Sequence, residues 1–114
     1  MHKDDVVRVR HMLDAAKEAL SFVQGKARGD LDQDRQLVLS LIRLIEVIGE
    51  AAAQVSAEFQ KVHPEIPWAV IVGMRNRLIH AYFDVDLDRV WDTVKDDLPK
   101  LVTQLDNVLA RSRS

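Results

Sequence analysis

A short stretch past the middle of the chain combines side chains that could act on a phosphodiester. Arg75 is followed directly by Asn76, five residues later by His80 and seven residues later by Tyr82. A guanidinium offers a planar fork of donors suited to a phosphate, and an imidazole, with an ordinary pKa of about 6.5, exchanges protons near neutral pH. These residues could therefore bind a phosphodiester and move its protons, although an Arg and a His at this spacing also occur by chance in many helices.

The spacing of Arg75 and His80 poses a geometric problem if both lie on one regular helix. Five residues turn through about 500°, so the two side chains would point about 140° apart. Either the helix ends near His80, or the Arg75 side chain curls around it, or a second subunit completes the site. Asn76, four residues before His80, would share its side of the helix, and we expect it to hold the imidazole or a phosphate oxygen.

A polar stripe follows the most apolar stretch of the sequence. Between residues 37 and 53 only four side chains are polar, and at about 100° per residue they share one helical face: Ser40, Arg43, Glu46 and Glu50. Either glutamate could orient Arg75 or His80. Alternatively, the stripe is the solvent-facing edge of a buried helix, and Arg75 is only an ion-pair partner of Glu46 or Glu50.

The composition favours a single all-α domain over residues 1–114. The chain is 47% hydrophobic and 30% charged, with only four Gly and three Pro, whereas folds of many short strands need more turn residues. The longest stretch without Asp, Glu, Lys or Arg is nine residues, 66–74. A membrane span needs about 20 apolar residues, so no membrane association is expected. The N-terminal residues lack the apolar stretch of a secretory signal, which predicts a cytoplasmic location.

Charge and potential ligands exclude several kinds of chemistry. Sixteen basic and eighteen acidic residues give a formal net charge of −2, so any phosphate site must be local. The absence of Cys excludes disulfides and thiolate catalysis. His2, His11 and His63 are scattered, and no pair of histidines has the three- or four-residue spacing of metal ligands on one helix turn. The sequence therefore predicts no metal and no cofactor.

Hydrophobic periodicity divides the chain into helices whose ends coincide with capping or breaking residues. Asp4 or Asp5 is expected to cap the first helix and Gly25 to end it, while Pro67 opens the third. Pro99 either kinks the fourth helix or opens a fifth segment. The predicted limits are 4–24, 30–59, 68–81, 86 through 94 and 100–110, with a turn at 83–85.

The sequence around the Arg and His resembles the HepT-like branch of the HEPN superfamily. Residues 75–82 match its Arg-x4-His-x-Tyr signature. Residues 48–52, Ile-Gly-Glu-Ala-Ala, resemble the motif of its second helix. The other stretches that resemble this branch, in the same order along the chain, are 63–68, 72–76, 82–84 and 90–94. The similarity therefore covers nearly the whole chain.

This resemblance implies an antiparallel bundle of four to five helices that forms a homodimer through the helices carrying the motif. It implies a metal-independent endoribonuclease that acts as the toxin of a type II/VII-like toxin–antitoxin system. The usual antitoxin of this branch is a minimal nucleotidyltransferase that attaches AMP to the motif tyrosine, here Tyr82. The implied catalytic pair is Arg75 and His80. Asn76, by its spacing from His80, and Glu46 and Glu50, from the polar stripe, are candidate supporting residues.

Metal-free RNA cleavage fits these residue types. The ribose 2′-hydroxyl attacks the adjacent phosphorus, which requires a base, an acid for the leaving 5′-oxygen and a cation for the phosphorane charge. His80 suits the proton transfers and Arg75 the charge. Two alternatives are a non-catalytic helical adaptor that binds a nucleotide or a nucleotidyltransferase through the same surface, and a dimeric bundle without a ligand. The intact motif favours the ribonuclease, because an adaptor needs no proton shuttle.

Overall fold

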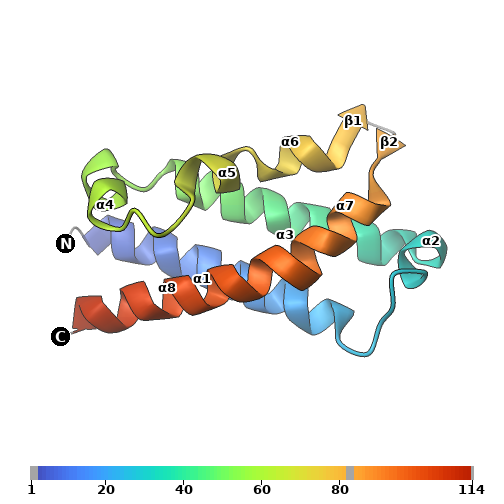
Figure 1. Cartoon of the computed structure of the whole chain (residues 1–114), viewed down its shortest axis with the longest axis horizontal. Coiled ribbons are helices and arrows are strands. Elements are labelled where there is room, and N and C mark those ends of the chain that lie inside the picture. The colour runs from blue at the N-terminus through green and yellow to red at the C-terminus, as the bar shows by residue number, and fades with distance from the viewer. Residues whose placement is uncertain (1–2, 82–83, 114) are drawn as a thin grey trace.

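Helices dominate the computed structural model, which describes residues 3–81 and 84–113 (Figure 1). The long helices are α1 (Lys3–Val23), α3 (Arg35–Ala53) and α8 (Leu98–Arg113). The shorter ones are α2 (Asp30–Gln33), α4 (Ala57–Val62), α5 (Trp68–Val72), α6 (Met74–Leu78) and α7 (Leu87–Asp92). A π turn, η1 (Thr93–Asp97), joins α7 to α8, and β1 (Ile79–Ala81) pairs with β2 (Asp84–Val85) in an antiparallel sheet.

Successive helical segments run in opposite directions along the bundle (Figure 1). α3 returns along α1, α5 and α6 return along α3, and α7, η1 and α8 run back along the bundle so that α8 packs on α1. Facing side chains such as Met12, Leu41, Ile45 and Leu105 are fully buried, and each contributes about 1.5–3 kcal/mol of hydrophobic stabilisation. The predicted antiparallel all-α bundle is confirmed. Within the described part of the chain, no helix combines the length and apolarity needed to cross a bilayer.

The second helix, predicted over residues 30–59, is three separate helices. α3 begins after Asp34, whose carboxylate accepts the N–H of Leu37 at 3.0 Å. It ends at Ala53, and α4 begins after Ser56, whose hydroxyl oxygen accepts the N–H of Phe59 at 3.1 Å. Side-chain acceptors at these two N-caps satisfy backbone donors that a continuous helix would have paired internally. The continuous apolar pattern concealed these boundaries.

Asp5 connects α1 to α4 and does not cap α1. Helix α1 already begins at Lys3, so the two predicted caps, Asp4 and Asp5, lie inside its first turn. The buried carboxylate of Asp5 accepts the backbone N–H of Ser56 at 2.8 Å and its hydroxyl at 2.7 Å. The aspartate therefore holds the N-cap of a helix that lies about fifty residues away in the sequence.

The third helix, predicted over residues 68–81, breaks at Gly73 and ends at Leu78. Beyond Leu78 the backbone is extended, and Ile79 pairs with Val85 across the sheet. The N–H of Asp86 donates to the carbonyl of Leu78 at 2.7 Å, which occupies one of the last carbonyls of the helix. The predicted turn at 83–85 is corrected at 84–85, which form β2, while residue 83 lies outside the described residues.

Two predicted boundary residues behave as expected, and a third, Pro99, does not form a boundary. Gly25 follows α1 with φ of 76°, a left-handed conformation that favours glycine at a helix C-terminus. Asp86 caps α7 by accepting the N–H of Arg89 at 3.0 Å. Pro99 is the second residue of α8, which follows α7 and η1 without a break, so this proline lies inside a continuous helical run and does not open a separate segment. The π turn ends at Asp97, two residues before this proline, whose missing N–H interrupts regular α-helical hydrogen bonding.

Candidate functional site

Gly49 allows the segment that carries Arg75 to approach α3 closely. A Cβ at this position would stand 3.2 Å from the carbonyl oxygen of Ile71 and 3.3 Å from that of Val72. Both contacts are with backbone, which cannot move aside as a flexible side chain would. The Gly of the Ile-Gly-Glu-Ala-Ala stretch therefore lets α5 lie against α3, and this packing brings α6 to the polar stripe.

Arg75 lies on α6 and pairs with the polar stripe of α3. Its Nε is 3.3 Å from Oε2 of Glu46, while Oε1 of the same carboxylate accepts a hydrogen bond from Nη1 of Arg43 at 2.6 Å. The other glutamate of the stripe, Glu50, lies 3.8 Å from Nη1 of Arg43. Of the two glutamates, Glu46 is therefore the one that contacts Arg75. The Arg75 side chain is 46% exposed, and within the described residues nothing hydrogen-bonds its terminal amino groups. Those amino groups can therefore receive an anion.

His80 lies on β1, and its partner is a carboxylate from the other side of the hairpin. Nε2 of His80 is 3.6 Å from Oδ2 of Asp86, and the imidazole side chain is 60% exposed. The pKa of Asp86 is lowered, chiefly by the hydrogen bond from the N–H of Arg89; desolvation opposes this effect, and His80 adds a further lowering. Sequence reasoning identified Asp86 only as a helix cap, because its contact with His80 depends on the hairpin.

The end of α6 at Leu78 resolves the geometric problem of the motif. Of the three alternatives, the first holds: the helix ends two residues before His80, so the separation of 140° expected on one helix does not apply. For the same reason, the helical spacing expected between Asn76 and His80 is absent, and a supporting role for Asn76 stays a prediction. Where the structure describes both partners, no hydrogen bond or ion pair joins the Arg75–Glu46 pair to the His80–Asp86 pair.

Two further donors lie beside Arg75 on α6. Asn76 and Arg77 are exposed, and neither side chain forms a hydrogen bond or ion pair with another residue that the structure describes. Among residues 3–81 and 84–113, no group of three or more His, Cys, Asp or Glu side chains is placed to hold a metal ion. The exposed side chains of α6 thus add a second cation and an amide to Arg75.

Comparison with known proteins bears directly on this motif. The model of a family described as "Ribonuclease HepT-like" matches residues 12–108, which include α3, α6 and both strands. This chain belongs to the HepT-like family. The resemblance in the motif stretches is thus confirmed over most of the chain.

Two relatives show how far this HepT-like similarity extends. A protein of Thermococcus cleftensis named "Probable ribonuclease HepT" is 38% identical over 100 residues, 88% of each chain. A protein of Caldanaerobacter subterraneus subsp. tengcongensis named "Putative RNase TTE0752" is 32% identical over 105 residues, 92% of this chain and 94% of its own. No solved structure matches this HepT-like chain. The likeness to the two relatives spans nearly whole proteins.

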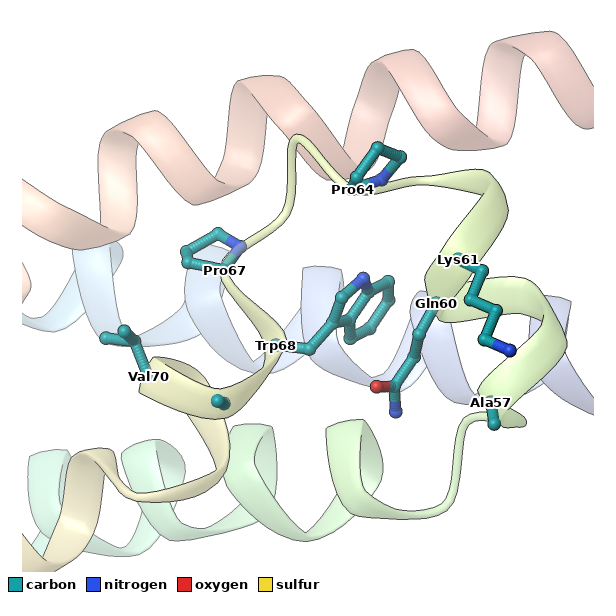
Figure 2. A pocket seen from close by; sticks show the side chains of 8 residues that line it. Ala57, Gln60, Lys61, Pro64, Pro67, Trp68 and Val70 are labelled. Carbon is teal, nitrogen blue, oxygen red and sulfur yellow. The ribbon is translucent and has the colours of Figure 1, made fainter.

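The predicted modification site of this HepT-like chain, Tyr82, lies outside the described residues. A separate cavity of about 510 Å³ lies near α4 and α5, at the end of the bundle opposite the two strands (Figures 1 and 2). Trp68 lines it with a buried indole whose Nε1 donates to the carbonyl of His63 at 3.0 Å, so this Trp belongs to the core. None of the candidate catalytic residues lines this cavity.

Proposed function

We propose that this chain is a metal-independent endoribonuclease whose catalytic residues are Arg75 and His80. The observation that carries this proposal is the end of α6 at Leu78, which leaves both side chains exposed without the opposed directions of a continuous helix. Membership of a ribonuclease family and the names of the two relatives support the same activity.

The proposed cleavage needs no group beyond the protein and the RNA. His80 takes the proton of the ribose 2′-hydroxyl, whose oxygen attacks the adjacent phosphorus and forms a new P–O bond. Arg75 stabilises the added negative charge of the phosphorane. The bond from phosphorus to the 5′-oxygen then breaks, and an imidazolium returns a proton to that oxygen. The products are a 2′,3′-cyclic phosphate and a 5′-hydroxyl.

Local donors replace the overall positive charge that this chain lacks. With a formal net charge of −2, binding of RNA depends on the exposed side chains of Arg75, Asn76 and Arg77. Glu46 is a positioning residue in this scheme, because it fixes Nε of Arg75 and leaves the terminal amino groups for the phosphate. Glu50 contacts Arg43 but not Arg75, so it is not a positioning residue in this scheme.

We further propose that the chain is the toxin of a toxin–antitoxin pair and acts in the cytoplasm as a homodimer formed by the motif-bearing segment. A two-fold axis would supply two copies of His80, one as base and one as acid. The partner is a minimal nucleotidyltransferase that attaches AMP to Tyr82. Because Tyr82 lies two residues beyond His80, the added bulk and negative charge would compete with RNA for Arg75.

Cleavage of RNA by the purified protein in excess EDTA tests the proposal. We expect products that end in a 2′,3′-cyclic phosphate, and resistance when the scissile nucleotide carries a 2′-O-methyl group. His80→Gln and Arg75→Gln should each lower the rate by about 10² to 10⁴. His11→Gln and Arg10→Gln, which alter exposed residues of α1, are matched controls that should cleave normally.

Two results would contradict this function. One is a wild-type protein that cleaves no RNA although it is folded. The other is His80→Gln cleaving at the wild-type rate. If such a protein still bound its nucleotidyltransferase partner, the non-catalytic adaptor would replace the ribonuclease.

A further inference from the structure

The two carboxylate oxygens of Asp86 have different partners. Oδ1 accepts the N–H of Arg89 at 3.0 Å and thereby caps α7. Oδ2 is directed to His80, 3.6 Å from Nε2. One oxygen is thus fixed by backbone, and the other is left to face the imidazole. The distance is longer than a hydrogen bond, as is common for catalytic pairs before substrate binds.

The backbone holds Asp86 in place relative to His80. The N–H of Asp86 donates to the carbonyl of Leu78 at 2.7 Å, and Ile79 pairs with Val85 across the two strands. His80 directly follows these two links on β1, and within the described chain its side chain has Asp86 as its single polar partner. The carboxylate is therefore the group that can select an orientation for an otherwise exposed imidazole.

A carboxylate opposite one ring nitrogen determines which nitrogen carries the proton. Ionised Asp can only accept hydrogen bonds, and a neutral imidazole has a single N–H. The pKa of Asp86 is lowered, mainly by the N–H of Arg89, so the group is ionised at neutral pH. Placing Nε2–H towards Oδ2 is favourable, whereas a bare Nε2 would set a lone pair against a negative charge.

We propose that Asp86 is a positioning residue that keeps the proton of His80 on Nε2, so that Nδ1 is the atom that accepts the proton of the ribose 2′-hydroxyl. This inference rests on the proposed ribonuclease function. When Nδ1 takes the proton, the imidazolium that forms faces the Asp86 carboxylate and is stabilised by it. In the copy of His80 that acts as the acid, the proton likewise passes from Nδ1 to the 5′-oxygen, so Asp86 itself never changes its protonation in either copy.

Asp86→Asn separates this role from helix capping. Asn caps helices about as well as Asp, so its side-chain oxygen can keep the N–H of Arg89. Its amide NH2 then takes the place of Oδ2, and a donor facing Nε2 favours the tautomer with the proton on Nδ1. Asp34→Asn is the matched control, because Asp34 caps α3 through Leu37 with the same distance of 3.0 Å and has no His beside it.

Nitrogen-15 NMR of the imidazoles in the full chain, at a pH where they are neutral, reads the tautomer directly. The signals of His80 are identified by their loss in His80→Gln. We expect Nε2–H in the wild type and in Asp34→Asn, and a shift towards Nδ1–H in Asp86→Asn at an unchanged unfolding midpoint. An Nδ1–H wild type, or an Asp86→Asn protein with the wild-type tautomer, would overturn the positioning role.

RNA cleavage gives the second measurement. Asp86→Asn should lower kcat by about 10- to 100-fold with KM unchanged, less than the roughly 10²- to 10⁴-fold effect of losing the acid–base group itself. Asp34→Asn should keep the wild-type kcat. Full activity of Asp86→Asn with an altered tautomer would overturn Nδ1 as the proton acceptor. A wild type that cleaves no RNA contradicts the ribonuclease, and the nitrogen spectra still decide whether Asp86 orients His80.

Discussion

Oε2 of Glu46, on α3, lies 3.3 Å from Nε of Arg75, on α6. This contact joins the polar stripe of one helix to the motif of another. The Arg75 side chain is 46% exposed and that of Glu46 30% exposed. Pairs exposed to this degree contribute about 0–1 kcal/mol to stability. The importance of the contact is therefore in where it places the guanidinium.

Glu46→Gln should impair cleavage more than it impairs folding. We expect kcat to fall about tenfold, because displacement of a positioned group by about an ångström can cost up to 10²-fold. KM should not rise, since the loss of a negative charge does not weaken RNA binding. Glu50→Gln is the matched control, because Glu50 lies on the same polar stripe and contacts Arg43 but not Arg75, and it should remain near wild type. Equal losses in both variants would argue against a specific role of Glu46.

The chain should sediment as a homodimer at micromolar concentration, with about twice the monomer mass of 13.0 kDa. The physical reason is the need for both a base and an acid, which two copies of His80 would supply. Mixing Arg75→Gln with His80→Gln subunits should restore part of the activity if each site combines residues of both subunits. A monomer that cleaves RNA at full rate would contradict the dimeric site.

Tyr82→Phe should escape modification by the nucleotidyltransferase partner. On co-expression with this enzyme, the wild type should gain AMP-sized mass increments that intact-mass spectrometry detects, and should lose ribonuclease activity. The variant lacks the phenolic oxygen that would form the phosphoester bond, so its mass should be unchanged and its activity retained. Equal labelling of both proteins would place the modification on another residue.

Asp5→Ala should destabilise the fold without touching the site. It removes the charged acceptor of the N–H and the hydroxyl of Ser56, and a hydrogen bond to a charged group contributes about 1.5–3 kcal/mol. Urea denaturation should show this loss in the free energy of unfolding. Asp14→Ala, which removes an exposed carboxylate from the same helix, should change it little. Equal midpoints for the two variants would show that the Asp5 contact does not hold α4.

The amino-acid sequence alone predicts the features that depend on neighbouring residues. Apolar side chains at helical spacing predict the long helices, because that spacing puts them on one face that must be buried. Gly25 ends a helix because glycine readily adopts a left-handed backbone conformation. Asp86 begins one because its side chain accepts a backbone N–H of the first turn. The motif around Arg75 and His80 indicates the family, which the comparison confirmed.

Long-range packing, in contrast, sets where α6 ends and which carboxylates reach the motif. Helix propensity continues past Leu78, and the competing extended backbone is stabilised by pairing with residues 84–86, which a local pattern does not reveal. The same applies to Asp5, whose partner Ser56 lies on a distant segment. Glu46 meets Arg75 because α3 packs against α6. Asp86 meets His80 because β1 and β2 pair. Contacts of this kind depend on how segments distant in the sequence pack together.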